Sequence, residues 1–217
     1  MSLASQTQTI DDLTGQAAQA LADQRYFQAE DLAHRALTLA RNDGDYQRMA
    51  VVVPTLALAR AGRLALANDV GTVMVLDEPF DDDVVIEPGC YLLQPPLVGA
   101  HARRLRLTAV RQEIPAVILC REPVIRLGLV PFVALGSGAT VRCKMRKPKD
   151  LENPDLEWFA TALEILGEAA AEMDPAMNLH KRINTLMTRI DALPEHAGLH
   201  DHLEQSCHEA AEAAEGS

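Results

Sequence analysis

Hydrophobic residues between Ile114 and Met145 fall into short runs that are rich in Val, Ile and Leu and are interrupted by Pro, Gly and Arg. Runs of this length and composition are typical of buried strands rather than helices. We therefore expect this stretch to form the centre of the fold, with helical segments before and after it.

A second strand pattern precedes that stretch. Residues 72–76 form a short apolar run, an acidic loop follows at 77–83, and a further apolar run ends at 90–93. Residues 97–113 carry apolar side chains at helical spacing, and strand-like residues return at 116–120. A strand, a helix and a strand in this order form a βαβ unit, whose two strands are parallel with a right-handed crossover.

Two further apolar runs, at 132–135 and 140–144, flank the sequence Gly-Ser-Gly-Ala at 136–139. This arrangement predicts an antiparallel β-hairpin. A phosphate-binding loop would lead into a helix, whereas a strand follows these glycines. We therefore interpret them as a turn.

The N-terminal pattern is helical. Residues 12–41 have the spacing of two helices joined by a short turn, and the sequence Asn-Asp-Gly at 42–44 provides a stop. A third helix is expected at about 46–61, kinked or broken at Pro54 and ended by Gly62. The second helix carries a stripe of small residues that lets a neighbouring helix approach closely. The stripe consists of Ala29, Ala33, Ala36 and Ala40.

This pair of helices resembles a tetratricopeptide repeat over about one repeat length. The matching residues are Leu13, Ala17, Ala20, Tyr26, Ala29, Ala33, Ala36 and Leu37. The family usually has an aromatic residue early in the first helix and a Pro after the second, where this chain has Leu13 and the stop at 42–44. Because one repeat cannot bury its own face, we expect the third helix to pack on the pair. The resemblance implies a concave, Ala-lined surface that a partner segment or the chain's own next helix fills.

Three helices are expected to close the chain. The sequence Asn-Pro-Asp at 153–155 supplies a capping residue, a first-turn Pro and an acid, and predicts a helix to about Glu172. Asp174 and Pro175 repeat this signal, and a last Ala- and Glu-rich helix follows Pro194. The middle helix has an apolar seam at alternating spacings of four and three, which we expect to pack within the chain. The seam consists of Leu179, Ile183, Leu186, Ile190 and Leu193.

These elements predict an α+β protein with three regions. They are a TPR-like helical hairpin in residues 1–63, a small mixed α/β sheet with one βαβ unit and a β-hairpin in 64–150, and a C-terminal helical bundle in 151–217.

From the composition we expect a globular protein that is located in the cytoplasm. At 217 residues with 48% hydrophobic and 4% aromatic residues, the chain can bury a largely aliphatic core. No apolar run reaches the roughly 18 residues of a membrane span, and the first residues lack the pattern of a secretory signal. The four cysteines have no CxxC spacing, so we expect free and mostly buried thiols. They are Cys90, Cys120, Cys143 and Cys207.

The net charge of −11 is unevenly distributed. Residues 1–100 carry 6 basic and 14 acidic side chains, 101–150 carry 11 and 3, and 151–217 carry 3 and 14. A basic centre thus lies between two acidic arms.

Three groups of residues could support chemistry. The first gathers at the carboxyl ends of the expected parallel strands, where open α/β sheets tend to bind ligands. It consists of Asp77, Glu78, Gln94, Arg121 and Glu122. These residues could position a polar ligand or form an ordinary ion-pair network.

The second group is a basic segment that could bind anions such as phosphates. It consists of Arg142, Lys144, Arg146, Lys147 and Lys149. Nucleic-acid surfaces usually interleave aromatic side chains, and only Phe132 is available here, so pairing with the acidic helices is an equal alternative.

The third group is His196, His200, His202, Cys207 and His208. On one continuous helix Cys207 lies about 10 Å beyond His200, so we expect no metal site.

No complete catalytic or cofactor motif is present, so we favour a non-enzymatic adaptor with no cofactor and a protein partner. The acidic arms would favour basic partner segments and repel nucleic acid. One alternative is an α/β enzyme or small-ligand binder with a site at the strand carboxyl ends. Another is a nucleic-acid binder that uses residues 101–149, which requires the basic segment to be exposed.

Overall fold

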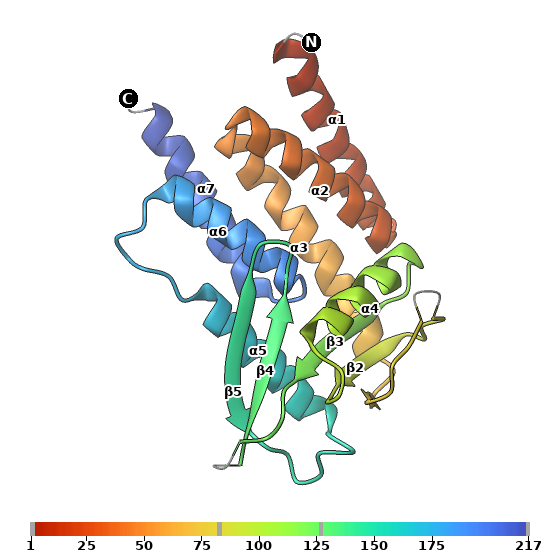
Figure 1. Ribbon diagram of the computed structural model, residues 1–217. Helices are drawn as coiled ribbons and strands as arrows, with labels where there is room; N and C mark the ends of the chain where they lie inside the picture. The colour runs from red at the N-terminus through yellow and green to blue at the C-terminus, as the bar shows by residue number, and fades with distance from the viewer. Residues whose placement is uncertain (1–2, 82–83, 126–127, 216–217) are drawn as a thin grey trace. The chain divides into compact units, whose positions relative to one another are not determined.

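The computed structural model describes residues 3–81, 84–125 and 128–215 and has an α+β fold (Figure 1). Its elements in chain order are α1 Leu3–Ala22, α2 Tyr26–Asp43, α3 Tyr46–Asn68, β1 Val73–Leu76, β2 Gly89–Leu93, α4 Gly99–Arg111, β3 Ala116–Arg121, β4 Leu129–Leu135, β5 Thr140–Arg146, α5 Leu156–Ala171, α6 Leu179–Ala192 and α7 Ala197–Glu215. Helices precede and follow the sheet, as the sequence predicts.

The chain forms two compact units, and neither is continuous in sequence. The helical unit comprises residues 1–62, 173–187 and 197–217, and the sheet unit comprises 63–172 and 188–196. The boundary at Gly62 lies beside the expected one at residue 63, whereas residues 151–217 are shared between both units. Two of the boundaries fall inside helices, after residue 62 in α3 and after residue 187 in α6.

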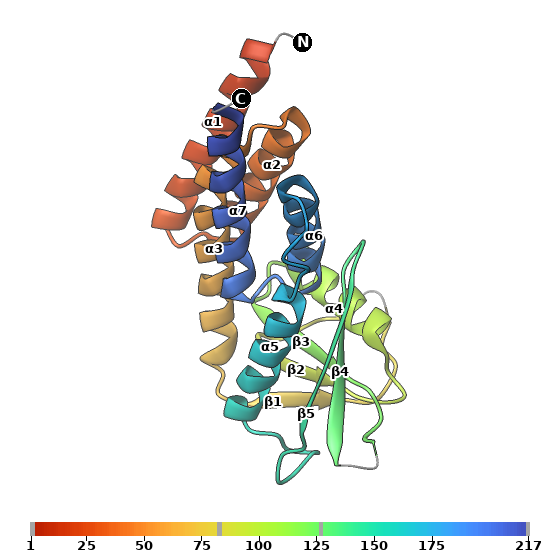
Figure 2. The same ribbon diagram turned by 90° about the vertical axis from the view of Figure 1, so that its left-hand side faces the viewer.

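The helical unit has two layers. Figures 1 and 2 show α1, α3 and α7 in one layer and α2 and α6 in the other. The predicted stripe of alanines on α2 is inside the unit, because each of its four members is 0% exposed. Gly44 ends α2 with φ 70° and donates its N–H to the carbonyls of Ala40 and Arg41, which confirms the predicted stop.

Helix α3 differs from its prediction because it continues through both expected interruptions. Pro54 lies inside the helix, where the loss of one backbone hydrogen bond is tolerated between well-packed turns. Gly62 does not end the helix either. A Cβ atom at this position would lie 2.4 Å from Cε1 of Tyr26. The glycine thus allows the Tyr26 ring to pack against the helix.

Helix α3 is also long and apolar enough to cross a membrane by length and composition, and it is the one described helix of which this is true. Buried helices of globular proteins pass the same test, and 44% of its most apolar window is buried inside the protein.

The sheet unit contains five strands in the order β1-β2-β3-β4-β5. Strands β1, β2 and β3 are parallel, and β4 and β5 form an antiparallel hairpin that pairs with β3 through Cys120 and Val133. This arrangement confirms the predicted βαβ unit and hairpin. Helix α4 packs on β3 and β4, and α5 packs on β4 and β5.

One side of the sheet and α4 enclose an aliphatic core. Strand residues alternate between the two sheet faces, so every second residue of β2, β3 and β4 points towards α4. The core cluster consists of Ile86, Tyr91, Leu93, Leu97, Ala102, Leu105, Ala109, Ala116, Ile118, Cys120 and Val133. The sequence pattern therefore places the strands and the helix α4 correctly.

The starts of the last helices differ from prediction. Asp155, not Asn153, caps α5, since its Oδ1 accepts the N–H of Trp158 at 2.7 Å. Helix α6 begins at Leu179 rather than at Pro175, and Asn178 Oδ1 accepts the N–H of Lys181 at 2.9 Å. In both places the side chain that accepts a backbone N–H of the first turn belongs to a residue closer to the helix than the predicted capping residue.

Candidate functional site

The carboxyl ends of the three parallel strands meet at one edge of the sheet. Strand β1 ends at Leu76 beside Leu93 of β2, and Leu93 lies beside Cys120 of β3. The next residue along each strand is Asp77, Gln94 and Arg121. Three of the five residues predicted for this edge are therefore neighbours.

These residues form a polar cluster that also includes Glu152. The Arg121 guanidinium donates to Gln94 Oε1 from Nε, at 3.1 Å, and from Nη2. Gln94 Nε2 in turn lies 3.3 Å from Asp77 Oδ2 and 3.3 Å from Glu152 Oε2. Gln94 and Arg121 are 4% and 8% exposed, whereas Asp77 and Glu152 are exposed.

Electrostatics and hydrogen bonding fix the orientation of this cluster. Because the guanidinium has only donors, the Gln94 amide must turn its oxygen to Arg121 and its nitrogen to the two carboxylates. Burial lowers the pKa of Arg121, and the charge of Glu152 acts in the opposite direction. A buried cation thus contacts two exposed carboxylates through one amide, and this closed network favours a structural role over a catalytic one.

Two predicted members of this group lie outside the cluster. Glu78 is exposed, and Glu122 instead faces Arg142, with its Oε1 3.6 Å from Arg142 Nε. Sequence reasoning missed Glu152, which lies in the loop between β5 and α5. The sequence shows only that this loop is polar, and polarity does not predict which other residues the loop contacts.

The basic segment is exposed. On β5 the buried residues Val141 and Met145 alternate with exposed basic ones, and the basic residues continue past the end of the strand. The exposed members are Arg142, Lys144, Arg146, Lys147 and Lys149. Among residues whose positions are described, Arg142 is the one member of this segment with an ion pair. Pairing of the segment with the acidic helices, an alternative from the sequence, is therefore not observed in this part of the chain.

The histidines near the C-terminus bind separate partners. His196 Nε2 lies 3.3 Å from Glu164 Oε1 in the sheet unit, and His200 Nε2 lies 3.1 Å from Arg60 Nη1 in the helical unit. Within the described residues, no three His, Cys, Asp or Glu side chains are grouped closely enough to hold a metal ion.

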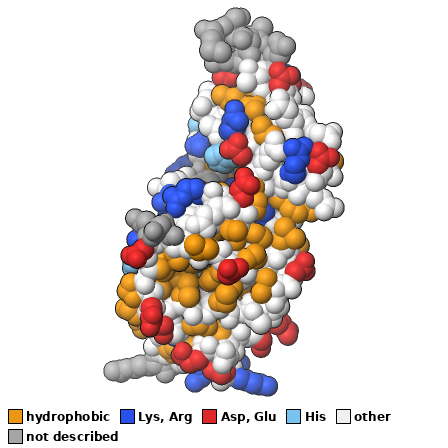
Figure 3. Space-filling view, turned by 90° about the vertical axis from the view of Figure 1, so that its right-hand side faces the viewer, with side chains coloured by type: hydrophobic (Ala, Val, Ile, Leu, Met, Phe, Trp, Pro, Cys, Tyr) orange, Lys and Arg blue, Asp and Glu red, His pale blue; other side chains and the backbone are white. Residues whose placement is uncertain are grey.

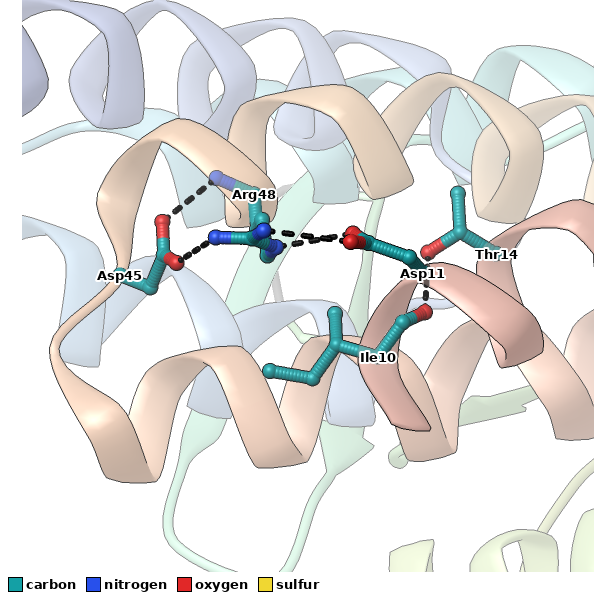
Figure 4. A network of polar contacts seen from close by, with 5 residues as sticks. All are labelled: Ile10, Asp11, Thr14, Asp45 and Arg48. Carbon is teal, nitrogen blue, oxygen red and sulfur yellow. Dashed lines mark hydrogen bonds and ion pairs between the residues drawn. The ribbon is translucent and has the colours of Figure 1, made fainter. Parts of the chain in front are cut away.

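Two arginine networks that the sequence did not reveal connect the helices of the helical unit. Arg60 of α3 contacts His200 of α7 and donates to Glu30 Oε1 of α2 at 2.8 Å. Figure 4 shows the second network, in which Arg48 of α3 lies between Asp11 of α1 and Asp45. Its Nε is 2.8 Å from Asp11 Oδ1, and its Nη1 is 2.7 Å from Asp45 Oδ2.

Hydrophobic side chains gather on one face of the molecule, where a few acidic side chains lie among them (Figure 3). The exposed large aliphatic residues of the sheet unit are Leu66, Val70, Val85, Val98, Leu107, Val110 and Val124. Such aliphatic side chains supply neither a nucleophile nor metal ligands, so they do not form a catalytic site.

The sheet unit therefore offers three surfaces with distinct chemistry: the polar cluster at the strand ends, the basic row on β5 and the exposed aliphatic side chains. Comparisons with protein-family models, curated proteins and solved structures find no match to this chain.

Proposed function

We propose that this protein is a non-enzymatic adaptor that binds segments of partner proteins on the α1, α3 and α7 layer of a TPR-like helical unit. The observation that carries the proposal is the exposure of two large aliphatic side chains on α3. Val51 is 59% exposed and Leu58 is 58% exposed. Residues seven apart on a helix lie on the same face, two turns from each other.

The sequence left open whether a partner segment or the chain's own helices fill the surface of the alanine stripe. The stripe on α2 is completely buried by the chain's own helices, so a partner has no access to it. We place the partner on the other layer, in which α3 lies between α1 and α7 in the view of Figure 1. The resemblance to a tetratricopeptide repeat supports this choice, because the helices of one layer line the partner groove in such arrays.

Charge in the helical unit favours a basic partner segment. The unit contains 7 basic and 13 acidic side chains, and α7 has no Lys or Arg. A shallow depression on α7 is lined by Asp201, Glu204, Gln205, His208, Glu209 and Glu212. At physiological salt the Debye length is about 8 Å, so these carboxylates would attract a basic segment that comes within about that distance of α7.

Affinity capture from a lysate of the source organism tests the proposal. The bait proteins are the wild type, the double variant Val51→Glu and Leu58→Glu, and the control Val85→Glu, which changes a residue that is 81% exposed in the sheet unit. We expect protein partners that resist nuclease treatment, remain with the control and are lost with the double variant. Partners that remain with all three baits, or that disappear on nuclease treatment, would contradict the proposal.

A further inference from the structure

Strand β5 forms an edge of the sheet, because it pairs with β4 on one side only. In an antiparallel pair, residues alternate between those whose N–H and C=O groups face the neighbouring strand and those whose groups face away. The Gly136 N–H donates to the Ala139 carbonyl at 2.9 Å, and the Lys147 N–H donates to the Gly128 carbonyl at 3.3 Å. The odd-numbered residues between these two bonds therefore face β4, and Arg142 and Lys144 face away from it.

Two further hydrogen bonds agree with this alternation. Pro131, which lies opposite Lys144, uses its carbonyl to accept the N–H of Glu122 on the β3 side, at 2.8 Å. The carbonyl of Arg146 accepts Nε1–H of Trp158 from outside the ladder, at 2.9 Å. In the part of the chain that is described, no group is hydrogen-bonded to the backbone N–H or C=O of Arg142 or Lys144.

The same residues carry the basic side chains. Arg142, Lys144 and Arg146 point to one side of the strand, and successive members are about 6.8 Å apart because each strand residue advances about 3.4 Å. Alternate residues of an added strand have the same spacing. A residue directly opposite a basic one would have its Cβ roughly 5 Å away, which is close enough for an ion pair.

We propose that β5 binds an extended acidic segment of a partner protein, which adds to the sheet as a further strand. The free N–H and C=O groups of Arg142 and Lys144 would pair with its backbone. Acidic side chains at alternate positions of the segment would pair with the basic row.

The alternation on β5 also determines which residues can lie between the acidic ones in the bound segment. Val141 and Met145 are buried beside α5 and Cys143 is half-buried between them, so residues between the acids lie next to an apolar surface. The sequence that fits has acids alternating with small or apolar residues.

Other occupants fit this edge less well. A second copy of β5 would place one basic row beside another, and like charges on neighbouring strands destabilise pairing. The phosphate backbone of DNA has acceptors but no donors for the free carbonyls. Aromatic side chains for base stacking are also not offered by this segment, since Phe132 is 0% exposed and packs against Trp158. This inference uses the sheet unit and is independent of the function proposed for the helical unit.

A titration with a fluorescent peptide tests the inference. The probe is a peptide of about ten residues in which Glu alternates with Thr, matched to the length of an ordinary strand. A peptide with Lys in place of Glu and a labelled single-stranded DNA serve as comparisons. We expect the full chain to bind the acidic peptide, more weakly as salt increases, and in preference to the DNA. Equal or tighter binding of the DNA, or no binding of the acidic peptide, would overturn the inference.

Substitutions at Lys144 separate charge from strand pairing. Lys144→Ala removes the charge and should weaken binding by less than about tenfold, as expected for one exposed ion pair. Lys144→Pro also removes the outward N–H but no ladder hydrogen bond, and should weaken binding by roughly a further threefold or more. Lys181→Ala, at an exposed position on α6, should have no effect.

Equal affinities of the Ala and Pro variants would exclude strand addition. Hydrogen exchange in the wild type provides a second measurement that does not depend on the folding of a variant. The amides of Arg142 and Lys144 should exchange more slowly when the acidic peptide is bound, and unchanged exchange at both would exclude the pairing.

Discussion

At the scale of single residues, buried polar side chains in this protein act as connectors. Gln94 accepts from Arg121 and contacts the carboxylates of Asp77 and Glu152, so one amide satisfies a buried cation. Arg60 has the same role among the helices, where it contacts Glu30 and His200. Each connector joins segments that are far apart in the sequence.

Replacement of Gln94 by Leu should destabilise the protein. The substitution keeps the volume but leaves the Arg121 guanidinium without its acceptor, and an unsatisfied buried group costs roughly 1–3 kcal/mol. Urea denaturation would measure the change in the free energy of unfolding. Glu78→Gln, at an exposed position of the same edge, is the control and should change it by less than about 0.5 kcal/mol. Equal stabilities of the two variants would mean that the network contributes little.

Two glycines inside helices should respond in opposite ways to Ala. A Cβ atom on Gly167 of α5 would lie 1.9 Å from Cδ2 of His196, whereas one on Gly15 of α1 would meet nothing within 4 Å. Gly15→Ala should stabilise the protein by about 0.5–1 kcal/mol, because Ala favours the helix. Gly167→Ala should be destabilising, since His196 must move from its buried position. Thermal unfolding of both variants checks the signs, and a stabilised Gly167→Ala would contradict the close packing.

At the scale of elements, arginines satisfy the carboxyl ends of two helices in the sheet unit. Arg189 Nη1 donates to the carbonyls of Ala170 and Glu172, both at 2.6 Å, at the end of α5. Arg106 of α4 donates to the carbonyls of Asp191 and Ala192, both at 2.7 Å, at the end of α6. A cation at this position satisfies free carbonyls and also complements the helix dipole.

The end of α6 should make stability sensitive to acid. Burial alone would raise the pKa of Asp191, but the backbone N–H and hydroxyl of Ser137, together with Arg106 and Arg103, lower it overall. A lowered pKa in the folded state means stabilisation that is present above the unfolded value of about 3.9 and is lost as the pH falls below it. The free energy of unfolding should therefore decrease less steeply between about pH 5 and pH 3 in Asp191→Asn than in the wild type. Parallel curves would show that Asp191 does not contribute.

The apolar seam of α6 should be essential for its packing. Leu186 is 0% exposed, as the seam predicts, and Leu186→Ala should cost roughly 2–5 kcal/mol. Leu58→Ala on α3 is a matched control, because its side chain is 58% exposed and should contribute less than about 0.5 kcal/mol. Chemical denaturation of both variants measures the difference, and a small effect at Leu186 would contradict its burial.

At the scale of the whole molecule, each unit is assembled from separated segments of the chain. The helical unit takes α1, α2 and most of α3 from residues 1–62 and completes its layers with residues 173–187 and 197–217. The side chains of Leu199, Leu203 and Cys207 on α7 are 0% exposed, so α7 is part of the interior of this unit rather than an appendage.

Removal of α7 should therefore disrupt the helical unit. A chain that ends at His196 should lose more helical circular dichroism than α7 itself contributes, because its removal exposes the buried side of α3 and leaves Arg60 without His200. A chain that ends at Ala211 keeps the buried positions of α7 and should retain its stability. A loss limited to the signal of α7 would show that α1, α2 and α3 fold without it.

The sequence predicted elements well where the signal was local. Alternating and helical periods located β1 to β5 and α4, and the seam located the buried side of α6. The errors depended on distant residues: Pro54 and Gly62 did not interrupt α3, because packing against Tyr26 and other segments outweighed local preference. Within the strand-end cluster, Glu152 was not predictable because its position depends on the path of a long polar loop. The resemblance to a tetratricopeptide repeat and the adaptor function stay predictions.

The division of the helical unit along the chain also affects its synthesis. Residues 63–172 separate α1, α2 and α3 from the helices that complete their layers. At a translation rate of about 5–20 residues per second, this stretch takes roughly 6–22 s to leave the ribosome. During that time the sides of α2 and α3 that α6 and α7 cover in the folded protein have no partner, and we expect a chaperone to bind the nascent chain there.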